Sequence, residues 1–351
     1  MKSVAVIGLG FGDEGKGLVT NWLAQHNQFE TNTRFSGGYQ VGHTVVTDEF
    51  RHVFQNFGSA TASGTATVWS KDCCIDPIKI KGEYEQLKKF DLTPKIYIHE
   101  ECAVTTPYDV VNSMNGTGIR ETFKRELDGC HFQAKHLTFP AVLEGKLRGL
   151  SNYYKLFESM IEIIDTFKEV VQFILDSEDI LIVPQHVFND FDKIPTIYEG
   201  SQGLLLDEKI GFYPDTTWGN LLPPKDIDVF MVTRAYKTRH GAGFFNDKKI
   251  TEHINIPSTE TNIFNPYQGD FRYDILDLDL IQYSASHIPL AHRNLVITCL
   301  DHIDEYVYIY KGIPNMCNSK QRFLEDIASA IGVNSAYYSE SHYSEKIKRF
   351  I

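Results

Sequence analysis

The residues with the clearest chemical potential lie in one glycine-rich stretch near the start of the chain, Gly8 to Gly17. An apolar run from Val4 to Ile7 precedes it and is typical of a buried strand, and the residues from Leu18 to Gln25 predict a helix. A strand, a tight turn and a helix N-terminus direct backbone N–H groups and the positive end of a helix dipole into one small volume. The sequence therefore predicts a phosphate site at this turn.

Two nucleotide-binding patterns overlap in this stretch. The GxGxxG pattern at residues 10–15 fits a dinucleotide site, but that site needs an acidic residue at the end of the second strand, and residues 33–38 contain none. The GxxxxGK pattern at residues 10–16 fits a phosphate-binding loop that includes its lysine. Gly17 stands where a serine or threonine hydroxyl would bind magnesium, so the usual metal ligand is missing.

Asp13 places a negative charge inside a loop that is suited to phosphate. A magnesium ion could bridge its carboxylate and the phosphates, or the carboxylate could take a proton from a bound substrate. Both roles could hold in turn, and the sequence leaves both open. The structural alternative is a plain connection between strand and helix, which the presence of Lys16 and of two acids in the loop makes less favourable.

Three further segments could bring polar side chains to a ligand. Residues 37–44 hold three glycines and then His43 beside a hydroxyl, which permits close backbone approach to a ligand with an imidazole at its edge. Gln202 is flanked by glycines at the end of a predicted strand, where open α/β sheets bind ligands. Residues 237–243 combine basic residues with two glycines, which suits an anion. For each segment, a purely structural role is about as well supported as a ligand contact. His43 could be a core histidine, and Gln202 and residues 237–243 could belong to plain turns.

The order of the expected elements indicates an α/β fold, with a single large domain over residues 1–351 around a central, mostly parallel β-sheet, a P-loop-like first turn and inserted loops and helices. An apolar stripe with helical spacing predicts one helix from Leu150 to Leu175. Residues 105–129 show little periodicity and are expected to form a long functional loop. Further strands are expected at 31–35, 53–57, 66–69, 95–99, 180–183, 194–198, 230–236 and 294–300, and further helices at 77–90, from about 277, and at 321–331.

The composition favours a globular protein that acts on a small substrate. The 351 residues carry a net charge of -12 without a long block of Lys or Arg, which argues against a nucleic-acid partner. The chain has no apolar run of 18 residues and no signal-peptide pattern at its start, so we expect no membrane partner. Six cysteines without a CxxC pair are typical of a reducing compartment. We therefore expect a cytoplasmic protein, in the host cytoplasm if the chain is viral.

Taken in order, these segments resemble the adenylosuccinate synthetases. The opening resembles the family's Gly-Asp-Glu-Gly-Lys-Gly loop, and residues 37–44 resemble its Gly-Gly-x-x-x-Gly-His-Thr segment. Residues 199–207, the Tyr-Pro-x-x-Thr segment at 213–217 and the Thr-Arg-x-Gly-Ala-Gly segment at 238–243 follow in the family order. The resemblance implies a two-step ligation, in which a nucleoside triphosphate phosphorylates the 6-oxygen of a purine monophosphate and the amino group of L-aspartate then displaces that phosphate.

The resemblance also implies a role for each matching residue. The implied catalytic residues are Asp13, His43, Lys16 and Gln202. The implied contacts to the nucleoside triphosphate come from Gly12, Gly15, Lys16, Gly17, Gly42, Thr44 and Asp301. Those to the purine monophosphate come from Asp13, Gln40, Ser113, Arg125, Gln202 and Thr217, and those to aspartate from Gln268, Gly269 and Arg272. Magnesium, the implied cofactor, would be bound by the Asp13 carboxylate and the Gly42 carbonyl.

In these implied roles, Asp13 takes the N1 proton of the purine so that negative charge gathers on the 6-oxygen, and His43 acts as an acid beside the transferring phosphoryl group. Lys16 and the loop amides hold phosphates, and Gln202 forms a hydrogen bond with the 6-position of the purine. The family also implies a homodimer, in which Arg125 could reach the monophosphate across the interface.

Three departures from the family pattern bear on the substrates. Asp270 stands where a family arginine reaches the ribose 2′-hydroxyl and aspartate, which weakens the case for a ribonucleotide. Cys299 replaces the lysine of the guanine-reading Thr-Lys-x-Asp segment, and the late Gly-Pro is not evident near residues 339–341, so GTP, ATP and dATP all stay open. A related viral branch makes the succinyl adduct of dGMP, with a serine where this chain keeps Asp13. We expect dGMP as the substrate, with IMP as a nearly equal alternative.

A GTP-binding switch or a kinase on the same phosphate loop is the alternative from another functional class. Gly17 in place of the magnesium hydroxyl argues against it, and it gives His43 and Gln202 no role. A catalytically silent nucleotide-binding scaffold would be expected to lose Asp13, Lys16 or His43, and all three are present.

Overall fold

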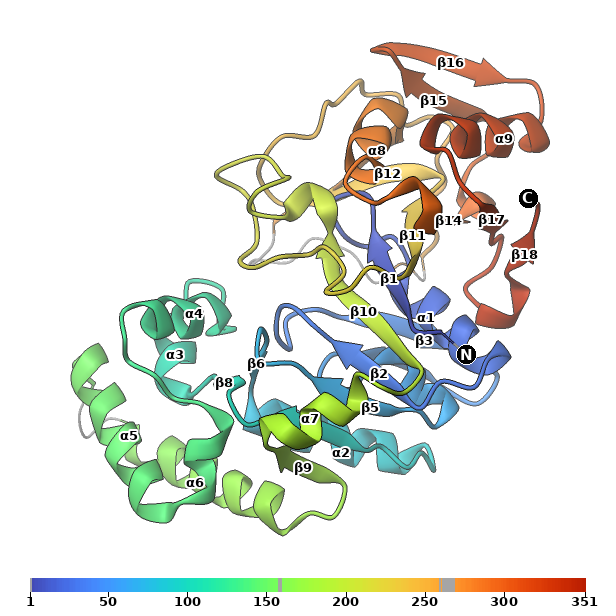
Figure 1. Cartoon of the computed structure of the whole chain (residues 1–351). Coiled ribbons are helices and arrows are strands. Elements are labelled where there is room, and N and C mark those ends of the chain that lie inside the picture. Colours follow the sequence, from blue (N-terminus) through green and yellow to red (C-terminus); the bar gives the residue numbers. More distant parts are fainter. Residues whose placement is uncertain (1, 157–159, 259, 261–268) are drawn as a thin grey trace. The chain divides into compact units, whose positions relative to one another are not determined.

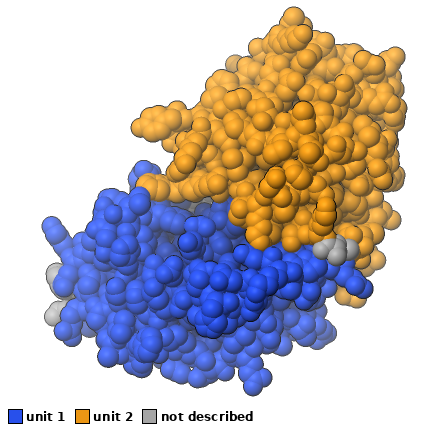
Figure 2. Space-filling model, viewed as in Figure 1, with its two compact units in different colours: residues 1, 28–42, 53–196 blue, residues 2–27, 43–52, 197–351 orange. Residues whose placement is uncertain are grey.

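The computed structural model describes residues 2–156, 160–258, 260 and 269–351 (Figure 1). The chain forms two compact units (Figure 2), of which unit 1 comprises residues 28–42 and 53–196 and unit 2 residues 2–27, 43–52 and 197–351. Each unit combines parallel strands with helices, so the expected α/β class with a mostly parallel sheet is confirmed. The single domain expected over residues 1–351 stays a prediction.

Unit 2 is built on neighbouring strands in the order β18-β17-β14-β11-β1-β10. Their bounds are β1 (Val4–Gly8), β10 (Thr196–Gly203), β11 (Asp228–Arg234), β14 (Arg293–Thr298), β17 (Ser335–Tyr338) and β18 (Lys348–Arg349). β1 pairs in parallel with both β10 and β11, and β14 and β17 continue the parallel order, whereas β18 runs antiparallel to β17. A second sheet contains β12 (Tyr236–His240), β13 (Phe271–Asp277), β15 (Tyr306–Tyr310) and β16 (Ile313–Cys317). The helices of this unit are α1 (Lys16–His26), α8 (Leu278–Ala285) and α9 (Lys320–Ile331), and β3 (His43–Val46) also belongs to it.

Unit 1 contains parallel strands in the order β2-β5-β7-β9. Their bounds are β2 (Thr31–Arg34), β5 (Ala66–Trp69), β7 (Ile96–His99) and β9 (Ile180–Val183), and the short strands β6 (Cys74–Ile75) and β8 (Ala103–Val104) pair with each other. The helices are α2 (Pro77–Lys89), α3 (Pro107–Asn112), α4 (Ile119–Leu127), α5 (Pro140–Tyr154), α6 (Ile161–Asp176) and α7 (Gln185–Phe191). Strand β4 (Arg51–Phe54) lies where the chain passes from unit 2 to unit 1. Among the described residues, no helix is long and apolar enough to cross a bilayer.

Strand β1 is held between two parallel neighbours by hydrophobic burial. All five of its residues are buried, and Ala5, Val6 and Ile7 are almost completely shielded from solvent. A strand that is covered on both faces is expected to be a continuous apolar run, and burial of each valine or isoleucine side chain contributes about 1.5–3 kcal/mol. The carboxyl end of β1 is therefore a rigid support for the loop that follows it.

Helix α1 begins directly after this loop and packs closely against β3. A Cβ atom at Gly17 would lie 2.9 Å from the Cβ of His43 and 2.9 Å from the carbonyl oxygen of Thr44. A larger residue at position 17 would therefore collide with the backbone of β3. This packing explains why glycine stands where other phosphate loops carry a hydroxyl residue.

The prediction of one helix from Leu150 to Leu175 is wrong, because α5 ends at Tyr154 and α6 begins at Ile161. Lys155 adopts a left-handed conformation with φ of 56°, and the N–H of Leu156 donates to the carbonyl of Ser151 at 3.0 Å. A left-handed residue with a backward hydrogen bond is a common way to end a helix. The apolar stripe is therefore shared by two helices.

The prediction of a long loop at residues 105–129 is also wrong, because α3 and α4 lie within it. Thr106 and Asp109 form a capping box that starts α3, and Gly118, with φ of 69°, precedes α4. The two helices have six and nine residues, which is too short to display a clear helical period in the sequence.

In Gly17→Ala, the added methyl group collides with β3, which costs about 1–3 kcal/mol. Helix propensity offsets about 1 kcal/mol of this cost, so we expect a net loss of up to about 2 kcal/mol in the free energy of unfolding. The measurement is urea-induced unfolding. Gly145→Ala in α5 is the matched control, because a Cβ there meets nothing within 4 Å, and it should stabilise the protein by about 0.5–1 kcal/mol. A similar effect of both substitutions would contradict the packing argument.

Candidate active site

The loop between β1 and α1 is folded around one of its own side chains. The carboxylate of Glu14 turns inward, and its Oε1 accepts hydrogen bonds from the backbone N–H groups of Gly10 at 3.1 Å and Gly12 at 2.8 Å. Its Oε2 pairs with Lys16 Nζ at 2.7 Å, and both side chains are buried. Glu14 therefore fixes two loop amides and the lysine that was expected to bind phosphate.

Two glycines make room for this carboxylate. Gly8 and Gly203 face each other in the parallel pair of β1 and β10, and a Cβ at either would lie 2.2 Å from a carboxylate oxygen of Glu14. Such a distance is impossible for a real side chain, so both positions need glycine while Glu14 points inward. The buried carboxylate is thus coupled to the ends of two neighbouring strands.

Asp13 lies at the exposed side of the same loop, in a left-handed conformation with φ of 62°. Its side chain is 25% exposed, and its Oδ2 lies 3.4 Å from Nε2 of His240. The Nε–H of Arg234 donates to the backbone carbonyl of Asp13. Burial raises the pKa of Asp13, while the positive charges of Arg234 and His240 act in the opposite direction. The loop therefore presents one carboxylate outward and keeps the other inside.

His43 is held by a buried carboxylate. Its Nδ1 lies 2.6 Å from Oε1 of Glu199 in β10, and its Nε2 lies 3.3 Å from the carbonyl oxygen of Ser201. The Glu199 side chain is fully buried and that of His43 is 6% exposed. A buried carboxylate needs a partner, so the pair fixes the orientation of the imidazole. Sequence reasoning did not select Glu199, although an acidic residue in a buried strand is a recognisable signal.

Gln202 lies against the phosphate loop from the end of β10. A Cβ at Gly12 would be 2.8 Å from its side-chain oxygen, so the two residues are close neighbours. Thr238 of β12 donates from its hydroxyl to the carbonyl of Gly12 at 3.4 Å. Thr217 is half-buried, and its N–H donates to the carbonyl of Leu206 at 2.8 Å. Gln202 therefore lies beside the phosphate loop, and its expected contact with the purine stays a prediction.

Arg239 and Arg272 are paired neighbours on strands β12 and β13. The Arg239 guanidinium donates to backbone carbonyls of Ala242, Phe244 and Asp215 at 2.8–3.0 Å. Burial lowers the pKa of both arginines, and the charge of Arg272 lowers that of Arg239 further. Arg239 therefore stabilises the turn after β12.

Arg272 has more hydrogen-bond donors than the described residues use. Its Nη1 donates to the carbonyl of Gly243 at 3.1 Å, whereas its Nε and Nη2 are buried without a hydrogen-bond partner among the described residues. Gly269 has φ of 80°. A Cβ atom added to it would lie 3.3 Å from the Cα of Gly241, so the two backbones approach closely. Gln268, the other expected aspartate contact, lies outside the described residues.

The expected monophosphate residues of unit 1 are engaged in local structure. The Ser113 hydroxyl donates to the carbonyl of Val110 at 2.8 Å, at the end of α3. Arg125 is completely buried, with ion pairs to Asp109 at 2.7 Å and Glu126 at 2.6 Å. The arginine thus braces α3 against α4, and its role in binding phosphate, within one chain or across a dimer, stays a prediction. Gln40, by contrast, has a buried side-chain oxygen without a partner among the described residues.

The residues expected around the triphosphate lie at the start of α1 and after β14. Gly15 has φ of 94° and precedes the first turn of α1, and Gly15, as a glycine, offers no side-chain cap to the N–H groups of that turn. Thr298 donates from its hydroxyl to the carbonyl of Glu14 at 2.7 Å, so the end of β14 touches the phosphate loop. Asp301 follows, with a side chain that is 38% exposed. Thr44 lies in β3, next to His43.

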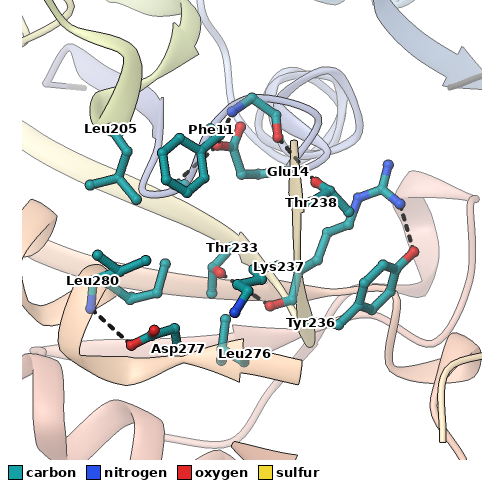
Figure 3. A pocket seen from close by; sticks show the side chains of 14 residues that line it. Phe11, Glu14, Leu205, Thr233, Tyr236, Lys237, Thr238, Leu276, Asp277 and Leu280 are labelled. Carbon is teal, nitrogen blue, oxygen red and sulfur yellow. Dashed lines mark hydrogen bonds between the residues drawn. The ribbon is translucent and has the colours of Figure 1, made fainter. Parts of the chain in front are cut away.

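A small cavity lies behind the phosphate loop in unit 2 (Figure 3). Phe11 and Leu205 face Leu280 and Asp277 across it, and Lys237 of β12 lines its side. Inside the cavity, the centre of a water molecule could move within about 20 Å³, which is enough space for one water. It is too small for a nucleotide.

The chemistry of the site fits magnesium. The described residues contain no group of three or more His, Cys, Asp or Glu side chains placed to hold a metal ion. Magnesium does not require one, because it keeps several waters and is bound by one or two carboxylates together with substrate phosphates. Asp13 offers such a carboxylate, with a side chain that is 25% exposed on the phosphate loop. Gly42 belongs to unit 1 and Asp13 to unit 2, so their joint binding of the ion stays a prediction.

Comparisons with known proteins identify the family. The family model of adenylosuccinate synthetase matches residues 5–348. The adenylosuccinate synthetase of Picrophilus torridus is 27% identical over an alignment that covers 94% of this chain and 85% of the relative. That of Parabacteroides distasonis is 28% identical and covers 72% of this chain and 67% of the relative.

Solved structures share the fold. A fully ligated adenylosuccinate synthetase from Plasmodium falciparum has a TM-score of 0.80 at 15% identity and is matched over all of both chains. The succinoaminodeoxyadenylate synthetase of cyanophage S-2L, bound to dGMP and dATP, has a TM-score of 0.66 at 14% identity, with 99% of this chain and 95% of the phage chain covered. The match of nearly the whole chain to one family model, on a site with the geometry described above, shows that this protein belongs to the adenylosuccinate synthetase family of carbon–nitrogen ligases.

Proposed function

We propose that this protein joins L-aspartate to carbon 6 of a 6-oxopurine nucleoside monophosphate through a 6-phosphoryl intermediate, with hydrolysis of a nucleoside triphosphate overall. The observation that carries the proposal is the arrangement in unit 2 of a phosphate loop, an outward carboxylate on it, and a buried histidine–carboxylate pair packed on its helix. A GTP-binding switch or a kinase would leave the pair of His43 and Glu199 without a role.

In the first half-reaction, Asp13 accepts the N1 proton of the purine, and electron density gathers on the 6-oxygen. This oxygen attacks the γ-phosphorus, the bond to the β–γ bridging oxygen breaks, and the nucleoside diphosphate leaves. Two features of Asp13 suit the role of base: its side chain is partly exposed on the phosphate loop, and burial raises its pKa and so strengthens the base.

His43 suits the role of acid beside the transferring phosphoryl group. Its Nδ1 faces the Glu199 carboxylate and its Nε2 the Ser201 carbonyl, and both of these are hydrogen-bond acceptors, so bonds to both require a proton on each ring nitrogen. The resulting imidazolium would offset the charge that develops on the phosphoryl oxygens. On substrate binding, Nε2–H would exchange the long contact to Ser201 for a phosphoryl oxygen.

The phosphates and the metal are assigned to the loop and its helix. Lys16 and the amides of Gly15 and Gly17 would hold the phosphates, and Asp13 and the Gly42 carbonyl would hold magnesium. The N–H of Gly12, also expected to contact the triphosphate, already donates to Glu14, so Gly12 would contribute close backbone approach and not a hydrogen bond. When bound, magnesium would offset the negative charge of the phosphates. Gln202 would form a hydrogen bond with the 6-position of the purine.

In the second half-reaction, the amino nitrogen of aspartate attacks carbon 6, the bond from carbon 6 to the phosphate oxygen breaks, and inorganic phosphate leaves while the amine loses one proton. Arg272 supports this step, because its Nε and Nη2, which have no partner among the described residues, can bind a carboxylate of aspartate in the bidentate manner that guanidinium groups favour.

We slightly favour dGMP over IMP as the purine substrate. This preference for dGMP rests on Asp270. Its exposed carboxylate stands where the family has an arginine that reaches the ribose 2′-hydroxyl, which weakens the case for a ribonucleotide. The carboxylate of Asp13 can accept hydrogen bonds from N1–H and from the 2-amino group of guanine, so it suits both bases. We leave GTP, ATP and dATP open as phosphoryl donors, because Cys299 replaces the lysine of the guanine-reading segment while Asp301 is retained. We further propose a homodimer in the cytoplasm.

The reaction is tested by a substrate matrix. The purified chain is incubated with IMP or dGMP, each with GTP, ATP or dATP, together with aspartate and magnesium, and the succinyl nucleotide is measured by chromatography. We expect product in at least one combination, with dGMP ahead of IMP. No product in any combination would overturn the ligase, and a clear preference for IMP would overturn the assignment of dGMP.

Asp13→Asn is expected to lower kcat by at least about 10²-fold to a small residual rate, because the amide cannot accept the N1 proton. Binding of the monophosphate, measured by calorimetry, should persist. Asp226→Asn is the matched control, since Asp226 is 81% exposed in the same unit, and should leave kcat unchanged. Unchanged turnover in Asp13→Asn would remove this residue from the role of base.

Glu199→Gln is expected to lower kcat by roughly 10²-fold, because the neutral amide keeps the size of the side chain but no longer stabilises a positive imidazole at His43. Single-turnover kinetics should locate the loss in the phosphorylation step. Glu252→Gln, at a residue that is 64% exposed, is the control. A normal rate of phosphorylation in Glu199→Gln would contradict the assignment of His43 as the acid.

A further inference from the structure

His240 lies at the end of β12, at a position that the family pattern leaves open. Its ring packs against Phe271 of β13, with 5.1 Å between the ring centroids. Its Nε2 lies 3.4 Å from Oδ2 of Asp13, and the side chain is 16% exposed. Its Nδ1 is buried and has no hydrogen-bond partner among the described residues. The carboxylate of Asp13 is thus the polar group that this imidazole faces.

The other charged groups near Asp13 are engaged elsewhere. They are Glu14, Lys16 and Arg234. Lys16 pairs with Glu14 at 2.7 Å, and Arg234 donates to the backbone carbonyl of Asp13 rather than to its carboxylate. The Nη1 of Arg234 donates hydrogen bonds to the Tyr236 hydroxyl and the Glu260 carboxylate. Within the described part of the chain, His240 is therefore the side chain placed to orient the Asp13 carboxylate.

We propose that His240 is a positioning residue for Asp13: its Nε2–H donates to Oδ2 and thereby turns Oδ1 toward the base of the substrate. This inference rests on the proposed function and deepens it, because it explains how one oxygen of a partly exposed carboxylate is kept in line for proton transfer. The terminal torsion of an aspartate is broad, so a free Asp13 would sample many orientations. Catalytic groups gain from neighbours that restrict them in this way.

The geometry suits such a contact. The imidazole is anchored by a strand on one side and by the Phe271 ring on the other, so its Nε2 is a fixed point. The backbone of Asp13 is fixed in its left-handed conformation and by Arg234, so the carboxylate can move chiefly by rotation of its own side chain. A distance of 3.4 Å is long for a hydrogen bond, but catalytic hydrogen bonds often shorten when the substrate binds.

The kinetic test compares His240→Val, His240→Gln and Asp13→Asn. Valine removes the donor and suits a strand, whereas glutamine places an amide N–H near the position of Nε2. We expect His240→Val to lower kcat between about tenfold and 10²-fold with little change in KM for the monophosphate, and His240→Gln to recover most of the loss. In the Asp13→Asn background, His240→Val should cause no further loss. His186→Gln, an exposed histidine in α7, is the control.

A normal kcat in His240→Val, an equal loss in His240→Val and His240→Gln, or an additional loss in the Asp13→Asn background would each overturn the proposal. Nitrogen-15 NMR of histidine-labelled protein separates this inference from the proposed reaction, because it needs no turnover. The Nε2 signal of His240, assigned with His240→Gln, should shift in Asp13→Asn while the signal of His186 does not. An unchanged His240 signal in Asp13→Asn would overturn the contact even if the ligase is active.

Discussion

The buried carboxylate of Glu14 is the constraint around which the candidate site is arranged. It binds two loop amides and Lys16, and it occupies the space that Gly8 and Gly203 leave free. An uncompensated buried charge would be strongly unfavourable, so these partners and the position of Glu14 depend on one another. Because the residue before it turns the other way, the same backbone presents the carboxylate of Asp13 outward. One loop therefore holds a structural acid and a candidate catalytic acid side by side.

The second constraint is the close packing of α1 on β3. The contact at Gly17 fixes the start of β3 against the helix that follows the phosphate loop, and His43 is the first residue of that strand. Glu199 then fixes the imidazole from β10, the same strand that carries Gln202 at its end. Glycine at position 17 thus permits His43 to pack directly against the helix that follows the phosphate loop.

The parts of the fold with clear local signals were predictable from the sequence. The first strand, turn and helix carry an apolar run, a glycine cluster and a helical pattern, and the structure has β1 and α1 there. Strand β16 was missed because it is almost wholly exposed and contains a proline and an asparagine, so it resembles a loop. Strand β13 was missed because charged residues interrupt its apolar pattern. Strand β15 carries a clear signal of aromatic and β-branched residues that was overlooked. The stripe from Leu150 to Leu175 was divided by a left-handed residue that no glycine or proline announced.

The site was predictable to the extent that its residues belong to ordered motifs. Asp13, His43 and Gln202 were selected from such motifs, and unit 2 contains all three. Glu199 and His240 were not selected, because their importance depends on contacts between segments that are far apart in the chain. Arg125 was selected by likeness to a family role, whereas its burial with Asp109 is a property of the folded helices α3 and α4. Motifs thus indicate the chemistry, and tertiary contacts decide which side chains are free to perform it.

The central claim is that the 6-oxygen of the purine is phosphorylated before aspartate enters. The most direct measurement uses a purine monophosphate labelled with oxygen-18 at the 6-carbonyl and follows the released inorganic phosphate by mass spectrometry. We expect one labelled oxygen in the phosphate for each succinyl nucleotide formed. Formation of the succinyl nucleotide with unlabelled phosphate would contradict it, because the 6-oxygen would then have left by another route.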